Sequence, residues 1–153
     1  MRLDREWIAA RIPHAGRMCL LEEVLDWSAG GIRCRSGTHR RADNPLRAYG
    51  RLGGACAIEY AAQAIAVHGA LVAPAAGRAA RSGYLASLRD VALGSLRLDD
   101  LDADLICEAS RIAGDGATAL YEFSVSVDGA AVARPPLASG RVAIVLHGEG
   151  RFD

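Results

Sequence analysis

The strongest constraint on how this chain folds is one long apolar segment. It runs from Leu52 to Val72 and reads LGGACAIEYAAQAIAVHGALV, with small or apolar side chains at almost every position. Gly53-Gly54 marks the start of a predicted helix over 53–73, and Ala73-Pro74 marks its end. A helix that is apolar on all sides must be wrapped by other elements rather than laid on a surface. The rest of the chain must therefore supply the elements that surround it.

Strand-like segments lie on both sides of this helix in the sequence. After a short opening helix over 3–10, strands are predicted over 17–27, 32–38, 83–93, 104–112, 118–127 and 141–146. One antiparallel sheet curled around one central helix satisfies the demand for wrapping, and this is the α+β architecture of the hotdog fold. We expect a single hotdog domain over 1–153, whose exposed strand edges are protected by pairing into dimers.

Charge and cysteine content exclude several classes of function. Lys and Arg together number 18, as do Asp and Glu, so no net field favours nucleic acid or a membrane surface. The four cysteines are far apart and form no C-x-x-C pair, so their spacing predicts neither a zinc site nor redox chemistry. Scattered single cysteines suit the reducing cytoplasm. Glu59, Gln63 and His68 interrupt the apolar helix, which argues against a membrane span.

A single acid, Glu59, stands near the start of this helix. On a helical wheel it shares a face with Gln63, Ala66 and Ala70, whereas His68 lies almost opposite. An isolated carboxylate in an apolar site either gains a partner or has its pKa raised, and a raised pKa suits a general acid. Alternatively, Glu59 is a structural acid that the helix dipole favours or that pairs with an arginine. Periodicity alone leaves both interpretations open.

Three motifs resemble those of the 3-hydroxyacyl-ACP dehydratases of the hotdog superfamily. Ile12-Pro13-His14 and the apolar 18–25 segment that follows resemble the opening of these enzymes. The 54–64 segment resembles their central helix, in which a glycine lies five positions before a catalytic glutamate, here Glu59. Residues 83–91 resemble the strand after the helix. More narrowly, the chain resembles the dehydratase-like proteins of aryl-polyene and related fatty-acid or polyketide clusters.

One position departs from the pattern of this family. The family carries its catalytic histidine fourteen residues before the glutamate, where this chain has Pro45. If the first two strands pair around a turn near Gly30, His14 lies opposite the region of Asn44 and Pro45. His14 is therefore the first candidate to replace the missing base, and His39 is the second.

The resemblance implies elimination of water from a 3-hydroxyacyl thioester without metal or cofactor. A neutral imidazole would take the proton next to the carbonyl and Glu59 would protonate the departing hydroxyl, the two groups coming from opposite subunits of a dimer. Backbone amides near Gly54 would hold the carbonyl oxygen, unless the glycines only make a loop-to-helix turn. The acyl chain would follow Ala62 and Ala66. The expected substrate-binding residues are Gly53, Gly54, Asn44 and Gln63.

The implied substrate carrier is an acyl carrier protein, or coenzyme A in its place. A carrier protein has an acidic surface and a phosphate on its prosthetic arm, and the arginines before the helix suit both. The alternative is that they form a solvated arginine-rich loop. These arginines are Arg33, Arg35, Arg40, Arg41, Arg47 and Arg51.

Two other functions compete with that of a dehydratase. Hotdog thioesterases also use a helix carboxylate, to activate water or to attack the thioester. Alternatively, the chain is an inactive hotdog subunit that supports an active partner in a heterodimer, since such a subunit would lack its usual base. The remaining histidines, His68 and His147, are expected to be solvated or packed.

Overall fold

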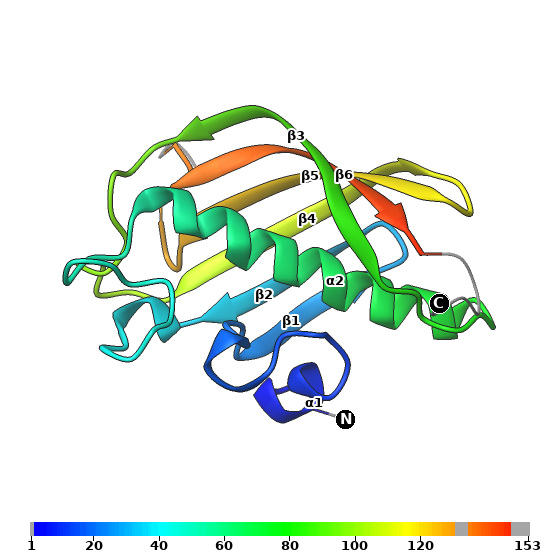
Figure 1. Cartoon of the computed structure of the whole chain (residues 1–153), viewed down its shortest axis with the longest axis horizontal. Coiled ribbons are helices and arrows are strands. Elements are labelled where there is room, and N and C mark those ends of the chain that lie inside the picture. The colour runs from blue at the N-terminus through cyan, green and yellow to red at the C-terminus, as the bar shows by residue number, and fades with distance from the viewer. Residues whose placement is uncertain (1, 131–134, 148–153) are drawn as a thin grey trace.

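The computed structural model describes residues 2–130 and 135–147 (Figure 1). Its main helix, α2 (Ala57–Ala75), follows a 3₁₀ turn, η3 (Gly54–Cys56), and lies across one face of a six-stranded antiparallel sheet. Figure 1 shows the sheet curving around α2, with the short helix α1 (Arg5–Ala9) beside β1. This arrangement confirms the predicted α+β architecture of the hotdog fold.

The strands follow the spatial order β1-β2-β4-β5-β6-β3. Their bounds are β1 (Glu23–Ser28), β2 (Gly31–Ser36), β3 (Gly83–Leu93), β4 (Leu105–Gly114), β5 (Thr118–Val127) and β6 (Ala138–Leu146). After β2 the chain passes through α2 and then enters β3 at the opposite edge of the sheet. The helix is thereby carried over the sheet face that it covers.

Several predicted bounds differ from the structure, and two of these differences have a physical reason. The sequence predicts a strand over 17–27, but residues 16–18 form a 3₁₀ turn (η1) and β1 begins only at Glu23. Gly16 has a φ of +58°, a conformation that interrupts an extended strand and that glycine adopts without a steric penalty. The helix continues through Pro74 to Ala75, because a proline in the last turn removes only one of its hydrogen bonds.

The core lies between α2 and the inner face of the sheet. Tyr60, Ala64 and Val67 of α2 are fully buried, as are many strand residues on the facing side. Those strand residues include Cys34, Leu105, Cys107 and Val125. The small side chains of the helix let its backbone approach the sheet closely, so an apolar helix surface is removed from water on several sides.

The helical segment Gly54–Ala75 has the length and hydropathy of a membrane span. In this fold it is the core helix, and 44% of its most apolar 18-residue window is buried inside the chain. Its apolar composition is therefore accounted for by the sheet that wraps it, in agreement with the prediction of a protein that does not span a membrane.

Candidate active site

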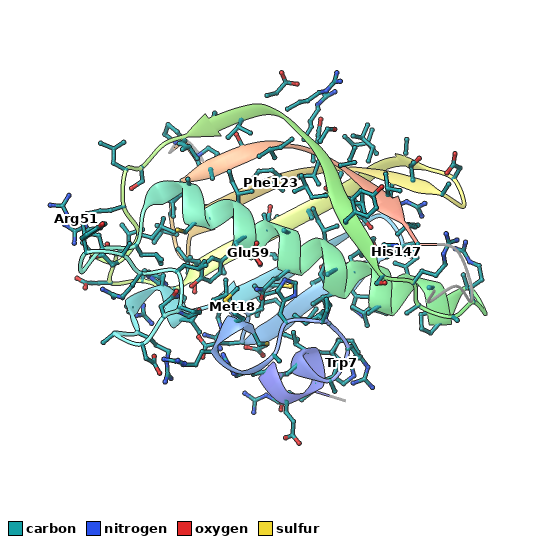
Figure 2. All side chains as sticks on the ribbon, viewed as in Figure 1. Trp7, Met18, Arg51, Glu59, Phe123 and His147 are labelled. Atoms are coloured by element: carbon teal, nitrogen blue, oxygen red, sulfur yellow. The ribbon has the colours of Figure 1, made fainter. Side chains whose placement is uncertain are left out.

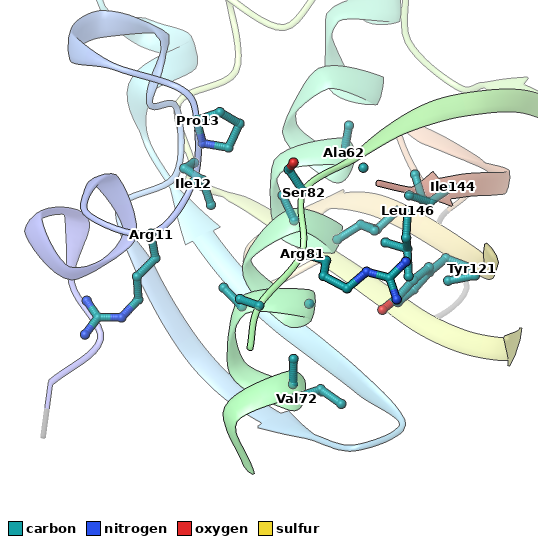
Figure 3. Close-up of a pocket in the computed structure, with 18 of the residues that line it drawn as sticks. Arg11, Ile12, Pro13, Ala62, Val72, Arg81, Ser82, Tyr121, Ile144 and Leu146 are labelled. Atoms are coloured by element: carbon teal, nitrogen blue, oxygen red, sulfur yellow. The ribbon is translucent and has the colours of Figure 1, made fainter. Parts of the chain in front are cut away.

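A cavity of about 750 Å³ lies along one side of α2 (Figure 3). It is bounded by the coil before β1, by the start of β3 and by residues of β4, β5 and β6. The helix lines it mainly with small side chains, which are Ala62, Ala66, Gly69, Ala70 and Ala73. Because these side chains are short, an elongated apolar ligand has room beside the helix.

His14 and Glu59 meet at the wall of this cavity. His14 Nε2 lies 3.2 Å from Glu59 Oε1, with 26% of the histidine side chain and 35% of the glutamate side chain exposed. Glu59 lies in the first turn of α2 (Figure 2), whereas His14 lies in coil between α1 and η1. His14 therefore reaches Glu59 without the strand pairing that the sequence suggests, because β1 begins nine residues later.

The pairing of His14 with Glu59 takes place within one chain. The resemblance implies that imidazole and carboxylate come from opposite subunits, whereas this contact joins two residues of the same chain. His14 Nδ1 is buried without a hydrogen-bond partner in the part of the chain that the structure describes, so Nε2 is the nitrogen available to a ligand. An imidazole nitrogen and a carboxyl group in contact at a cavity wall can exchange a proton with each other and with a ligand.

Gln63 positions the segment that follows His14. Its Oε1 accepts a hydrogen bond from the Leu20 N–H at 2.9 Å, and its Nε2 donates to the Met18 carbonyl oxygen at 2.7 Å. Nε2 also donates to Glu59 Oε1 at 3.3 Å. Gln63 is fully buried and lies outside the cavity lining, so its observed contacts are with the protein.

The glycines at the start of the helix make a close backbone contact. The Gly54 N–H donates to the Leu96 carbonyl oxygen at 2.9 Å, and a Cβ on Gly54 would overlap the carbonyl oxygen of Ser95. A Cβ on Gly53 would meet no atom within 4 Å. Neither glycine lines the cavity. The Gly54 amide that the sequence suggests for a substrate carbonyl is thus engaged by the protein backbone.

Asn44 is also engaged inside the protein. Its Nδ2 donates to the Thr38 carbonyl oxygen at 3.0 Å and to the Tyr60 hydroxyl at 3.1 Å, and its Oδ1 accepts from the Leu46 N–H at 2.9 Å. Asn44 is buried and does not line the cavity. These bonds fasten the loop that carries Pro45 to α2.

The other histidines lie away from Glu59. His39 is fully buried, with Nε2 2.9 Å from the Leu101 carbonyl oxygen, and it does not line the cavity. His68 is fully buried on α2 between Tyr121 and Ser28. Burial lowers the pKa of both His39 and His68, so both rings are neutral near pH 7. The structure therefore brings only His14, of these three, to the acid.

Five of the six arginines before the helix are paired with carboxylates. Arg33 pairs with Glu108, Arg40 and Arg35 share Asp104, and the two others pair as Arg41–Asp43 and Arg47–Asp99. Among the described residues, no carboxylate oxygen lies within 4.0 Å of Arg51, which is exposed near the start of α2 (Figure 2). Arg51 is thus the one most available to an acidic carrier.

The cysteines form no cluster with other metal ligands. Cys19, Cys34, Cys56 and Cys107 are all free. Within residues 2–130 and 135–147, no group of three or more His, Cys, Asp or Glu side chains is placed to hold a metal ion. Burial raises the pKa of the Cys34 thiol to about 12, so this thiol is an unreactive core side chain.

Arg111 and Tyr121 line the far part of the cavity and are absent from the predicted site. Tyr121 belongs to the buried row of β5, together with Ala119 and Phe123, and Arg111 follows buried residues in the alternating row of β4. Because alternate residues of a strand lie on the same face, the alternation in these two segments predicts that both side chains face the helix.

The chain matches the ApeP-like family, described as ApeP dehydratase, over residues 7–145. It is similar in structure to the dehydratase heterocomplex ApeI:P from Xenorhabdus doucetiae, with a TM-score of 0.77 and 24% identity over 93% of this chain and 91% of that chain. A thioesterase from Haemophilus influenzae has a TM-score of 0.57, with 10% identity over 82% of this chain and 77% of that one. Zebrafish thioesterase superfamily member 2 has a TM-score of 0.58, with 13% identity over 94% and 95%. No curated protein matches the sequence.

Proposed function

Because this chain belongs to the ApeP-like dehydratase family, we propose that it eliminates water from a 3-hydroxyacyl thioester to give a 2-enoyl thioester. The observation that carries the proposal is the contact of His14 Nε2 with Glu59 Oε1 at the wall of a long apolar cavity. The contact supplies a base and an acid in the place where an acyl chain fits. His14 takes the role that the histidine at the position of Pro45 has in related dehydratases.

The reaction needs two proton movements of opposite direction. Neutral His14 takes the proton from C2 of the acyl chain, the C2–H electron pair forms the C2–C3 double bond, and the C3–O bond breaks. Glu59 acts in its protonated form and gives its proton to the departing hydroxyl, which leaves as water. Afterwards His14 is protonated and Glu59 is ionised, so one proton passed from Nε2 to Oε1 restores the starting state. Their 3.2 Å separation supports this direct return.

A carrier protein is the proposed source of the thioester. Arg51 is exposed at the end of the molecule where α2 begins, and a cation there attracts an acidic carrier surface or the phosphate of its arm. Coenzyme A offers a phosphate to the same residue.

The four predicted substrate-binding residues remain predictions; they are Gly53, Gly54, Asn44 and Gln63. The hydrogen bonds described above favour structural roles for Gly54, Asn44 and Gln63. The free cysteines suit the proposed cytoplasmic location.

A second hotdog subunit is the proposed structural partner. The structurally similar ApeI:P protein is a dehydratase heterocomplex. In this chain β3 is an edge strand of 11 residues, and Tyr84, Leu85, Leu88 and Val91 are exposed along it. A long apolar edge strand pairs readily with another strand. In a homodimer or a heterodimer, a strand of the second subunit would pair with the free backbone groups of this edge. In a heterodimer, this chain is either the active subunit or a support for an active partner.

The chemistry is tested by offering the protein a 3-hydroxyacyl thioester and a saturated acyl thioester of equal length. We expect enoyl product from the first and no free thiol from either. Glu59→Gln and His14→Asn should each lower the rate by about 10²–10⁴-fold, since each removes one proton-transfer group. His147→Asn, the same change at an exposed side chain outside the cavity lining, serves as the control.

Other products point to the competing functions. Free thiol released from both substrates would make the chain a thioesterase. No turnover alone or with a hotdog partner, or an undiminished rate in Glu59→Gln, would contradict the proposed dehydratase. Mixing Glu59→Gln and His14→Asn subunits should not restore activity, because neither chain then holds a complete pair. Restored activity would instead show that the pair is formed across subunits.

A further inference from the structure

The helix-facing row of β4 ends in a charged side chain. Leu105, Cys107 and Ala109 alternate along this strand and are buried. Arg111 continues the same row, is half-buried and lines the cavity. In the described part of the chain, no carboxylate oxygen lies within 4.0 Å of it. An inward-facing guanidinium without a protein partner is unfavourable unless water or a ligand supplies acceptors.

Arg111 lies directly across from Tyr121. The two residues are partners in the antiparallel register of β4 and β5, where side chains of one face stand about 5 Å apart. The register shifts just after Arg111, and Gly114 makes room for the guanidinium, because a Cβ on Gly114 would overlap it. The two strands therefore present a cation and a phenol oxygen side by side to the far end of the cavity.

Two other charged residues at this end are engaged by the backbone. Asp115 Oδ1 accepts hydrogen bonds from two amides of its own turn, at 2.7 and 2.8 Å. Arg81 donates to two backbone carbonyl oxygens, at 2.5 and 2.7 Å. Figure 3 shows Arg81 and Tyr121 directed toward the same end of the cavity. The backbone thus holds Asp115 and Arg81, and Arg78, which also lines the cavity, is exposed. Arg111 is the half-buried cation at this end whose guanidinium has no hydrogen-bond partner among the described residues.

Toward a ligand in the cavity, the Tyr121 hydroxyl can accept a hydrogen bond but cannot donate one. His68 Nε2 lies 2.7 Å from the Ser28 carbonyl oxygen, which can only accept, so Nε2 carries a hydrogen. Burial lowers the pKa of His68, so the ring is neutral and its Nδ1 has a free lone pair. The Tyr121 hydroxyl, 2.7 Å from Nδ1, therefore donates its hydrogen to His68. Its oxygen is left as an acceptor.

We propose that Arg111 and Tyr121 recognise a hydroxyl group at the far end of the acyl chain. A hydroxyl accepts a hydrogen bond, here from Arg111, and donates one, here to the Tyr121 oxygen. A carboxylate would bring its lone pairs against those of Tyr121, and a methyl group would leave Arg111 unpaired. His68 is a positioning residue that fixes the direction of the Tyr121 hydrogen. The proposal rests on the proposed function for the thioester end of the ligand.

The two ends of the cavity are separated along the helix. Tyr121 bonds to His68, which follows Glu59 by nine residues and so lies about 14 Å further along the helix axis. An acyl chain that places its C2 and C3 atoms at Glu59 must span this distance before its end reaches Arg111. The recognised ligand is therefore an extended acyl thioester with a terminal hydroxyl.

The proposal is tested by binding, which needs no turnover. The probes are pantetheine amides of a 3-hydroxyacyl series with equal numbers of heavy atoms, ending in a hydroxyl, a methyl or a carboxylate group. At the best chain length we expect the hydroxyl probe to bind the full chain about tenfold more tightly than the methyl probe. The carboxylate probe should bind more weakly than the hydroxyl probe.

Variants then assign the preference to its residues. Tyr121→Phe should reduce the hydroxyl-to-methyl affinity ratio to about one, whereas Tyr49→Phe, the same change at a fully exposed tyrosine, should keep it. Arg111→Gln should also reduce the ratio. His68→Leu frees the hydrogen of Tyr121, so the carboxylate probe should gain affinity relative to the hydroxyl probe. A merely structural role for His68 would not shift that order.

Several results would overturn the proposal. These are equal affinities for the hydroxyl and methyl probes, tightest binding of the carboxylate probe, an unchanged ratio in Tyr121→Phe, or no binding of any probe. If the hydroxyl preference holds but no enoyl product forms, the proposed dehydration fails while the terminal recognition stands. If enoyl product forms but the hydroxyl and methyl probes bind equally well, the terminal recognition fails while the proposed dehydration stands.

Discussion

Glu59 is held at the cavity wall by two side chains of different chemistry. His14 contacts one carboxylate oxygen from the coil before β1, and Gln63 donates to the same oxygen from the next turn of the helix. Gln63 also binds Met18 and Leu20, so one buried amide links the acid to the segment that follows the base. Gln63 therefore connects Glu59 to the coil that follows His14.

Replacing this amide should destabilise the fold. In Gln63→Met the shape is nearly kept, but the Leu20 N–H and the Met18 carbonyl oxygen lose their partner in a buried place. Two unsatisfied groups should lower the free energy of unfolding by about 2–4 kcal/mol. Urea denaturation followed by circular dichroism measures the change. A loss below about 0.5 kcal/mol would show that water or neighbouring groups replace the amide.

At the scale of elements, the start of the central helix depends on backbone contact with the segment before β4. Gly54 bonds to Leu96 and lies against the Ser95 carbonyl oxygen, whereas Gly53 faces open space. The two adjacent glycines thus look alike in the sequence and have different roles in the structure. Only at Gly54 does the absence of a side chain permit the approach.

The two glycines provide a matched pair of substitutions. Gly54→Ala should lower the free energy of unfolding by about 3 kcal/mol, because its Cβ overlaps a backbone atom that cannot move aside. Gly53→Ala should change it by less than about 1 kcal/mol, because its φ of −65° suits alanine and nothing blocks the Cβ. Thermal melting of both variants compares them. Equal losses would contradict this account.

Strand alternation predicted most elements, and the exception has a physical reason. β3 and β5 have the predicted bounds because turn signals flank alternating residues. The apolar 18–21 segment reads as a strand, but its backbone bonds to side chains instead of to a neighbouring strand. Gln63 takes the Met18 oxygen and the Leu20 N–H, and Thr38 Oγ1 donates to the Leu20 oxygen. Long-range side-chain contacts of this kind leave no periodic signal in the sequence.

The site was predictable only where composition or resemblance singled out a residue. Glu59 is the lone acid of an apolar helix, and His14 belongs to a motif of related dehydratases. Their meeting depends on the course of the coil before β1, which strand pairing did not describe. Arg111 and Tyr121 were missed because their strands were assigned without following which face each residue occupies, although the buried Ala109 two positions earlier marks the inner row.

At the scale of the whole molecule, two buried neutral histidines link stability to pH. Burial lowers the pKa of His39 and His68 below the ordinary value of 6.5. Below pH 6.5 the unfolded chain therefore binds more protons than the folded chain, and acid favours unfolding. Asp99, whose pKa is lowered by its hydrogen bond from Arg97, adds to this loss only near its ordinary value of 3.8 and below.

We therefore expect the free energy of unfolding to fall as the pH is lowered from 7.5 to 5. The fall should be smaller in His68→Gln than in the wild-type chain, because one of the two titrating groups is gone. Denaturation in urea at several pH values measures both slopes. Parallel slopes for the two proteins would show that His68 does not contribute in this range.

The exposed β3 edge makes association a property of the whole fold. Val91 and its apolar neighbours are left in water in the isolated chain. Val91→Lys should weaken the dimer formed with a second copy or a hotdog partner, because it places a charge in the apolar strip. Leu96→Lys, at a 93% exposed position outside the strand, is the control. Sedimentation velocity distinguishes the two, and a dimer unaffected by Val91→Lys would place the interface elsewhere.

The contact of His14 with Glu59 inside one chain also bears on how such genes diverge. If acid and base were shared between two polypeptides, a duplicated copy that decayed would silence every site in a mixed pair. If the proposed acid and base are both encoded in one reading frame, one copy can lose them while its sister keeps a complete pair. Duplication can then release one copy from catalytic selection and leave it free to specialise as a scaffold.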